Sequence, residues 1–332
     1  MKTIFFGTQP YDRESFDRIN ADYGIRIKYH RSHLNIDNVP LAQGADAVCI
    51  FVNDSADAPT VGELARMGVR LIALRCAGFN NVDLKAAAEH GITVVRVPAY
   101  SPYAVAEHAV ALMLSLNRKV HRAYWRTRDG NFAPARPPRL RYARQNGRHR
   151  RHGKNRPCSS SASCGVSGWR SSATTPAPTR RSPGNRGMTY VPLTELYRRS
   201  DIISLHCPLT DRTLHMIDAE AIGQMKDGVI IINTGRGQLI RTSDLIEGLK
   251  EKKIGAAGLD VYEEEADYFY QDTSDRIMDD DMLARLLSFN NVILTSHQGF
   301  FTREALDNIA RTTLENIQAF SHGECLNEVK YK

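Results

Sequence analysis

The chain has 332 residues, of which 42% are hydrophobic, a length typical of about two domains. Its formal net charge of +7 would favour an anionic partner, and its six cysteines are scattered along the sequence. No apolar run approaches the ~18 residues of a membrane-spanning helix, and no signal-peptide pattern is present, so we expect a cytoplasmic protein with reduced thiols.

Short apolar runs alternate with helical patterns over the first hundred residues. An alternation of this kind is typical of an α/β domain with a parallel sheet, in which ligands bind beyond the carboxyl ends of the strands. The patterns predict strands at 3–6, 25–29, 47–52, 69–74 and 92–97, and helices at 15–20 and 61–67.

Two of these strand ends carry candidate binding residues. Ala77 and Gly78 follow the strand at 69–74, and Tyr100 follows the strand at 92–97. Either motif alone would be an ordinary exit from a strand into a loop, so their interpretation depends on the motifs further along the chain.

A long helix is predicted at 105–128, where apolar residues recur at helical spacing. Glu107 and His108 lie in this helix. Adjacent residues of a helix do not share a face, so we interpret this pair as a packing contact between domains and give it no catalytic role.

Residues 133–187 differ from the rest of the chain. They hold 13 basic residues and no acidic ones, whereas the remainder has 31 basic and 37 acidic residues. Such a composition predicts a basic, disordered linker. It would bind nucleic-acid phosphates without specificity, but it has only two aromatic residues and no recognisable binding fold.

A shift of one base in the reading frame recovers an α/β pattern in this segment. Starting from Pro137, one permitted peptide is LLGFDMHGKTAAIVGTGKIGRA, which contains a strand, a Gly-rich turn and a helix start. A second slip near Ser160 permits IRILRGFGMAVLGYDP, and the original frame returns by Met188. Our hypothesis is that residues 133–187 are out-of-frame translation.

The alternation of strands and helices resumes at Met188. We interpret the three aspartates at 279–281 as a solvated acidic loop. Strands are predicted at 201–205, 229–233, 256–260 and 292–295, and helices at 193–199, 219–225 and 302–322.

The last three predicted strands are followed by polar residues that suit acid–base chemistry. The planar fork of Arg236 can pair with a carboxylate through two parallel hydrogen bonds. His297 can gain and lose a proton near neutral pH. Glu265 beside it would favour the imidazolium and fix the orientation of the ring. Glu263 and Glu264 are rivals for this role.

The order and spacing of these motifs resemble the D-specific 2-hydroxyacid dehydrogenase family, and most closely its bacterial fermentative NAD-dependent D-lactate dehydrogenases. The resemblance covers about 1–133 and 188–332. It implies two Rossmann-like or flavodoxin-like parallel-sheet domains, with an NAD-binding domain of 102–299 inserted into a substrate domain of 1–101 and 300–332. It also implies a homodimer that reduces pyruvate to D-lactate with NADH.

The resemblance implies a role for each candidate residue. Arg236 would bind the substrate carboxylate and the Glu265–His297 pair would handle the proton, Glu265 being preferred because it stands five residues after Asp260. No metal site is expected. Further substrate contacts would come from the backbone N–H groups of Ala77 and Gly78, and from Tyr100 and Phe300. NAD contacts would come from His206, Cys207, Pro208, Thr234, Gly235, Arg236 and Asp260.

One alternative follows from the segment at 133–187. In the literal sequence it lacks the Gly-rich turn whose amides hold a pyrophosphate, and the acidic residue that would receive the adenosine ribose. The alternative is therefore an impaired dehydrogenase that cannot hold NAD.

Overall fold

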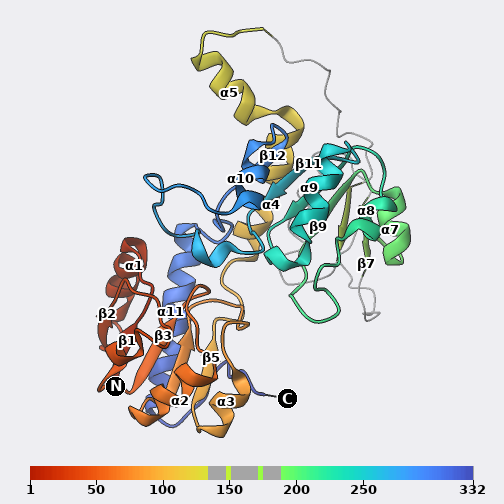
Figure 1. Ribbon diagram of the computed structural model, residues 1–332. Coiled ribbons are helices and arrows are strands. Elements are labelled where there is room, and N and C mark those ends of the chain that lie inside the picture. Colours follow the sequence, from red (N-terminus) through yellow and green to blue (C-terminus); the bar gives the residue numbers. More distant parts are fainter. Residues whose placement is uncertain (134–146, 151–170, 175–187, 332) are drawn as a thin grey trace. The chain divides into compact units, whose positions relative to one another are not determined.

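The computed structural model describes residues 1–133, 147–150, 171–174 and 188–331 (Figure 1). The chain forms two compact units, one of Met1–Ser101 with Phe300–Lys332 and one of Pro102–Gly299. Each unit contains one parallel sheet, which confirms the α/β class. No helix within the described ranges is long and apolar enough to cross a membrane.

The first unit is built on five parallel strands in the order β2-β1-β3-β4-β5. β3 and β4 are buried at every position, as central strands covered on both faces should be. This is the flavodoxin-like order, in which ligands bind where the direction of winding reverses, here between β1 and β3. The strands are β1 Lys2–Phe5, β2 Arg26–Tyr29, β3 Ala47–Ile50, β4 Leu71–Leu74 and β5 Thr93–Arg96.

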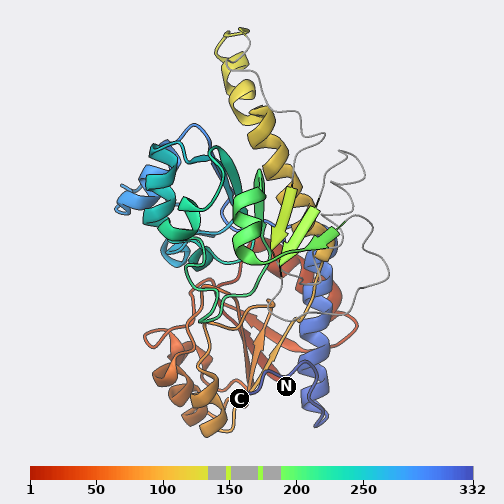
Figure 2. The same cartoon turned by 90° about the vertical axis from the view of Figure 1, so that its right-hand side faces the viewer.

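Helices cover both faces of this sheet. Helix α11 packs on α1, β4 and β5, whereas α2 packs on α3, and Figure 2 shows α11 (blue) and the two orange helices on opposite sides of the strands. Helix α1 begins five residues earlier than predicted because Gln9 and Asp12 form a capping box around its first turn. The helices are α1 Pro10–Asn20, η1 Val39–Ala42, α2 Ala58–Arg66, α3 Leu84–Glu89 and α11 Arg303–Ser321.

The second unit is built on seven parallel strands in the order β12-β11-β10-β9-β6-β7-β8. Counted from β6, this is the doubly wound order 3-2-1-4-5-6 with one added strand, and its winding reverses between β6 and β9. The strands are β6 Gly147–Arg150, β7 Ser171–Thr174, β8 Met188–Tyr190, β9 Ile202–Leu205, β10 Val229–Asn233, β11 Ile254–Leu259 and β12 Val292–Leu294.

Alternate side chains of β10 enter two different cores. Ile231 belongs to the large core that includes residues of α8 and α9, whereas Ile230 and Ile232 pack with the apolar face of α4. The alternation follows from the period of two in a strand and explains why the whole run is apolar. The helices are α4 Pro102–Arg118, α5 Val120–Arg128, α7 Leu193–Arg199, α8 Ala219–Gly223, η2 Gly237–Leu239, α9 Thr242–Lys250, η3 Glu265–Asp267 and α10 Asp281–Ser288.

The prediction of one continuous helix at 105–128 was wrong. Helix α4 ends at Arg118, and Lys119 has a left-handed backbone with φ of 51° before α5 begins. The last buried residue of α4 is Leu116, and α5 buries none of its residues. The apolar stripe therefore ends where the chain leaves the sheet, and packing no longer holds the two helices in line.

The interpretation of 279–281 as a solvated loop was also wrong. Asp280 is the N-cap of α10, where its carboxylate accepts hydrogen bonds from the N–H groups of Met282 and Leu283, both at 2.9 Å. It also accepts the hydroxyl of Tyr262 at 2.6 Å. The acidic residues mark a helix start, at which a carboxylate satisfies unpaired N–H groups.

Most of the segment at 133–187 lies outside the described residues, and with it the Gly-rich turn of the shifted frame and the basic run of the nucleic-acid alternative. Two stretches are described, and they form β6 and β7. The prediction of a linker without structure was therefore wrong at these positions. Counted from Pro137, the run AAIV of the shifted peptide falls on β6.

Candidate active site

The candidate residues divide between the two units. Ala77, Gly78, Tyr100 and Phe300 lie in the first unit, and the other candidate residues lie in the second. In the second unit they follow β9, β10, β11 and β12, at the carboxyl edge of the sheet.

His297 and Glu265 meet in the second unit. The ring Nδ1 of His297 lies 2.8 Å from Oε1 of Glu265, and both side chains are largely buried. The other oxygen of Glu265 accepts the N–H of Tyr262 at 3.1 Å, which holds the carboxylate in place. Because Nδ1 is engaged, Nε2 is the ring nitrogen that can exchange a proton with a ligand.

The turn that carries His297 has an unusual backbone. Ser296 and His297 both have φ of 55°, in the left-handed region that costs non-glycine residues free energy. The N–H of His297 donates to the carbonyl of Asp260 at 2.5 Å. Such a turn persists only when its surroundings hold it.

Asp260 holds this turn through its carboxylate. Oδ1 accepts the hydroxyl of Thr295 at 2.6 Å and the N–H of Gln298 at 2.7 Å, and Oδ2 accepts the N–H of Gly299 at 2.7 Å. Nε2 of His108 lies 3.1 Å from Oδ1. Burial opposes ionisation of Asp260, but the hydrogen bonds from His108 and Thr295 outweigh it and lower its pKa to about 2.

Sequence reasoning missed the part played by His108. Its Nε2 lies 2.9 Å from the hydroxyl of Thr295, so its polar contacts join α4 to the loop after β12 inside the second unit. The predicted packing between domains does not describe these contacts. The sequence did offer one signal for these contacts, because His108 is a polar residue within the apolar stripe of α4.

Arg236 follows β10 in a loop held by Asn233. The side chain of Asn233 accepts the N–H of Gly235 at 3.0 Å and donates to the carbonyl of Arg236 at 2.8 Å. The guanidinium donates to the carbonyl of Gly235 at 2.8 Å. No ion pair to Arg236 occurs among the described residues.

The Arg236 loop lies directly on the loop that carries Glu265. A Cβ atom added to Gly237 would stand 1.9 Å from the carbonyl oxygen of Tyr262, so only glycine allows this approach. Glu263, in the Glu265 loop, lies 2.5 Å from Nε2 of His215, before α8, and accepts the N–H of Thr242, the first residue of α9, at 2.9 Å.

These contacts distinguish the three consecutive glutamates. Glu263 is engaged by His215 and Thr242, Glu264 is exposed, and Glu265 alone of the three is paired with His297.

The loops after β9 and β10 fit a polar cofactor. Thr234 has a buried hydroxyl without a hydrogen-bond partner among the described residues, which a ligand group could satisfy. His206 lies with Nε2 2.8 Å from the hydroxyl of Ser204. Cys207 is buried, and the carbonyl of Pro208 accepts the hydroxyl of Thr213 at 2.8 Å.

In the first unit, two side chains donate hydrogen bonds to backbone carbonyls of the loop after β4. Nη1 of Arg96 donates to the carbonyl of Ala77 at 2.7 Å, and the thiol of Cys76 to that of Gly78 at 3.2 Å. The carbonyl of Tyr100 accepts the side chain of Asn308 at 2.8 Å.

Phe300 belongs to an aromatic group in the first unit. Its ring centroid lies 5.7 Å from that of Phe51 and 6.0 Å from that of Phe301, and the residue itself is buried. Phe300 is the first residue of the C-terminal segment that completes the first unit.

Comparisons with known proteins agree with this geometry. The model of the family "D-isomer specific 2-hydroxyacid dehydrogenase, NAD binding domain" matches residues 162–299. The D-lactate dehydrogenase of Escherichia coli (strain K12) is 44% identical over 338 residues, which cover 99% of this chain and 100% of that protein.

Solved structures are similar over the same extent. The apo-structure of D-lactate dehydrogenase from Escherichia coli has a TM-score of 0.88 at 43% identity and covers 99% of this chain and 100% of its own. D-lactate dehydrogenase with NAD+ from Lactobacillus jensenii has a TM-score of 0.81 at 28% identity, with 100% of both chains covered. Matches over the whole length favour a working dehydrogenase over the impaired chain considered above.

The match to the NAD-binding family model and the similarity to the NAD-bound structure identify NAD as the cofactor. The chain belongs to the D-isomer specific 2-hydroxyacid dehydrogenase family.

Proposed function

We propose that the enzyme reduces pyruvate to D-lactate with NADH. The observation that carries the proposal is the 2.8 Å contact between His297 Nδ1 and Glu265 Oε1. It leaves Nε2 to give a proton to the ketone oxygen, while NADH supplies the hydride to the adjacent carbon. The substrate follows from the relatives named D-lactate dehydrogenase.

The other candidate residues complete the site. Arg236 pairs with the substrate carboxylate, and the N–H groups of Ala77 and Gly78 are the donors that the first unit offers to it. Glu265 stabilises the imidazolium before the proton leaves. Phe300 and Tyr100 limit the space beside the methyl group of pyruvate.

The NAD contacts are the loops after β9, β10 and β11. The hydroxyl of Thr234, unpartnered among the described residues, would form a hydrogen bond to the cofactor, and the loops at His206-Cys207-Pro208 and Gly235 would help to hold it. Asp260 would support the nicotinamide end through the turn that it holds.

The decisive test is turnover and stereochemistry in one set of assays. We expect NADH oxidation with pyruvate, and NAD reduction with D-lactate but not with L-lactate. His297→Ala should abolish both while the circular dichroism spectrum is retained, and His322→Ala, at an exposed helix end, should leave both unchanged. Oxidation of L-lactate, or full turnover by His297→Ala, would contradict the proposal.

We further propose a cytoplasmic homodimer in fermentative metabolism. Light scattering of the purified enzyme should give twice the mass of the 332-residue chain. A monomer with full activity would count against the dimer, and recovery of the activity outside the cytoplasmic fraction against the location.

We also propose that residues 133–187 are translated out of frame. β6 is paired on both sides, by β9 and β7, yet its sequence is Gly-Arg-His-Arg. Parallel strands in such a position are normally rich in Val, Ile and Leu. The AAIV run of the shifted frame suits the position. Resequencing the coding DNA decides, and an uninterrupted frame encoding Arg148-His149-Arg150 would reject the idea.

A further inference from the structure

Arg75 is a charged residue in the core of the first unit. It follows β4 directly, and its side chain is 1% exposed. Burial of a guanidinium costs much free energy unless neighbouring groups compensate its charge. The contacts of Arg75 therefore indicate what the buried charge does for the fold or the site.

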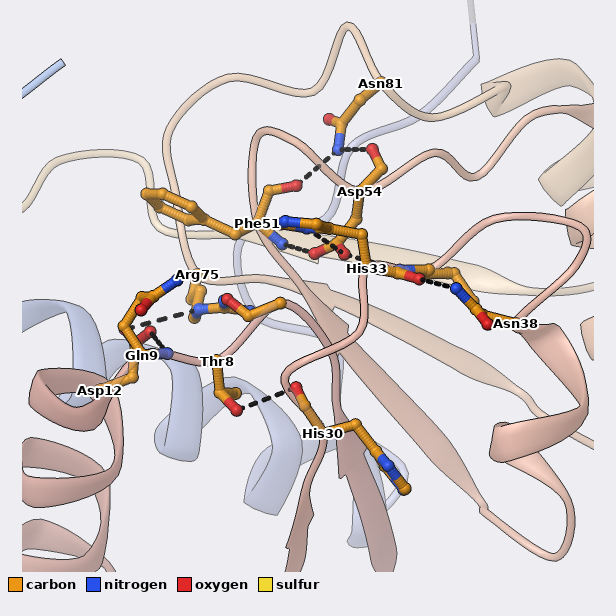
Figure 3. A network of polar contacts seen from close by, with 12 residues as sticks. Thr8, Gln9, Asp12, His30, His33, Asn38, Phe51, Asp54, Arg75 and Asn81 are labelled. Atoms are coloured by element: carbon orange, nitrogen blue, oxygen red, sulfur yellow. Dashed lines mark hydrogen bonds and ion pairs between the residues drawn. The ribbon is translucent and has the colours of Figure 1, made fainter. Parts of the chain in front are cut away.

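The guanidinium joins the ends of four elements (Figure 3). Nη2 donates to the carbonyl of Gly7, after β1, at 2.8 Å. Nε lies 3.6 Å from Oδ1 of Asp12, in the first turn of α1. Cζ lies 5.0 Å from the ring centroid of Phe51, after β3. Gly7 and Phe51 follow the carboxyl ends of β1 and β3, the two strands between which the winding of this sheet reverses.

The backbone and the ring of Phe51 are both fixed by contacts. Its N–H donates to Oδ2 of Asp54 at 2.5 Å, and its carbonyl accepts the side chain of Asn81 at 2.7 Å. Its ring lies against Arg75 and also against Phe300, at 5.7 Å between centroids. Arg75 thus supports the ring on which the proposed substrate wall rests.

Arg75 also begins the loop proposed to bind the substrate carboxylate. Its N–H donates to the carbonyl of Ile50 at 3.1 Å, and the next three residues are Cys76, Ala77 and Gly78. A displacement of Arg75 would therefore move both the loop and the ring of Phe51. Misplacement of binding groups by about 1 Å can cost about 100-fold in rate.

We propose that Arg75 is a positioning residue that aligns Phe51 and the loop at 76–78 for a small 2-oxo acid. This inference rests on the proposed function, because it concerns the same substrate. Arg75 itself would touch neither substrate nor cofactor. Its planar cation lies over the ring of Phe51 and donates to Gly7 at the same time, which the compact ammonium of lysine cannot do.

The test is Arg75→Lys, which keeps the charge and loses the planar fork. We expect KM for pyruvate to rise about tenfold or more, with kcat within about threefold and KM for NADH unchanged. The ratio of kcat/KM for 2-oxo-4-methylpentanoate to that for pyruvate should also rise, because the wall is loosened. A purely structural residue would lower the melting temperature without changing these parameters.

The matched control is Arg13→Lys. Arg13 also lies over an aromatic ring, that of Tyr29 at 5.6 Å, and pairs with an aspartate, but it is exposed. It should leave every kinetic parameter unchanged.

A double-mutant cycle tests whether the effect passes through Phe51. Phe51→Leu keeps an apolar side chain and removes the ring, so Arg75→Lys should raise KM for pyruvate much less in this background. If Arg75→Lys does not fold, Asp12→Asn replaces it in the cycle, because Asp12 is the ion-pair partner of Arg75.

The outcomes separate the two proposals. The positioning role is overturned if folded Arg75→Lys has the wild-type KM for pyruvate and the wild-type ratio of kcat/KM values for the two substrates. It is also overturned if the effects of Arg75→Lys and Phe51→Leu on KM are fully additive. Absence of any 2-oxo acid reduction by the wild-type enzyme overturns the proposed function instead. Oxamate, which resembles pyruvate, then allows a test without turnover. Its effect on the melting temperature is measured for wild type and for Arg75→Lys. An equal rise in melting temperature for both again rejects the role of Arg75.

Discussion

Replacement of Asp260 by asparagine should break hydrogen bonds that hold the turn of His297 and so lower the free energy of unfolding. Asparagine has nearly the same shape, but one of its two polar atoms is a donor. With its NH2 group at the Oδ2 position it would face the N–H of Gly299, and in the flipped orientation it would face Thr295 and Gln298. Either way a buried donor loses its acceptor, which costs about 1–3 kcal/mol.

The ionisation of Asp260 gives an independent magnitude. Its pKa falls from 3.8 to about 2 in the folded protein, and each unit is worth about 1.4 kcal/mol, so the charge contributes about 2 kcal/mol at neutral pH. Because the folded pKa is lowered, this stability is complete above the unfolded value and is lost as pH falls through 4 towards 2. At pH 3 about half of it should remain.

Urea unfolding at pH 7 and pH 3 measures the loss of unfolding free energy in Asp260→Asn and its dependence on pH. Asp260→Asn should be about 2 kcal/mol or more less stable than wild type at pH 7, and the difference should narrow by about half at pH 3. Asp211→Asn, at an exposed position, should match wild type throughout. Equal unfolding free energies at pH 7, or a gap that does not narrow, would refute the assignment of Asp260 as the ionised anchor of this turn.

Two further predictions concern loops of the second unit. Gly237→Ala should lower kcat/KM for pyruvate about 100-fold, because its Cβ atom would separate the Arg236 and Glu265 loops. Gly223→Ala, whose Cβ atom would meet nothing within 4 Å, is the control, and equal kinetics would disprove the close approach. Asp280→Ala should cost about 1–2 kcal/mol of unfolding free energy through loss of the α10 cap, whereas exposed Asp279→Ala should cost nothing measurable.

The strands were predictable because their signal is local. β3, β4, β9 and β10 are apolar runs between polar residues, and the structure places strands within a few residues of each prediction. Helices α3, α9 and α10 were not predicted. They are six to nine residues long, so their helical spacing barely repeats, and the caps at Asp83 and Asp280 were the available signals.

The geometry of the candidate site was less accessible from the sequence. Ser296 and His297 adopt φ of 55°, and no glycine in the turn predicts this backbone. The turn is held instead by acceptors of Asp260, which is distant in sequence. Arg75 resembled any residue leaving a strand, since its partners come from β1, α1 and β3. Contacts between distant segments have no local pattern.

The three consecutive glutamates show the same limit and allow one more prediction. All three have the same chemistry, and only their partners separate them. Glu265→Gln should lower kcat for pyruvate about 100-fold or more, because the imidazolium of His297 loses its carboxylate. Glu264→Gln should have no effect, since that residue is exposed.

Glu263→Gln should behave differently from both of its neighbours. It weakens the contacts to Thr242 and to His215, whose N–H donates to the carbonyl of Gln238 just after Arg236, so KM for pyruvate should rise while kcat changes little. A matched set of three variants thus separates proton transfer from substrate anchoring within one short loop. If Glu263→Gln lowered kcat as strongly as Glu265→Gln, the division of roles between these glutamates would be wrong, because a group acting only through Arg236 cannot slow the proton step.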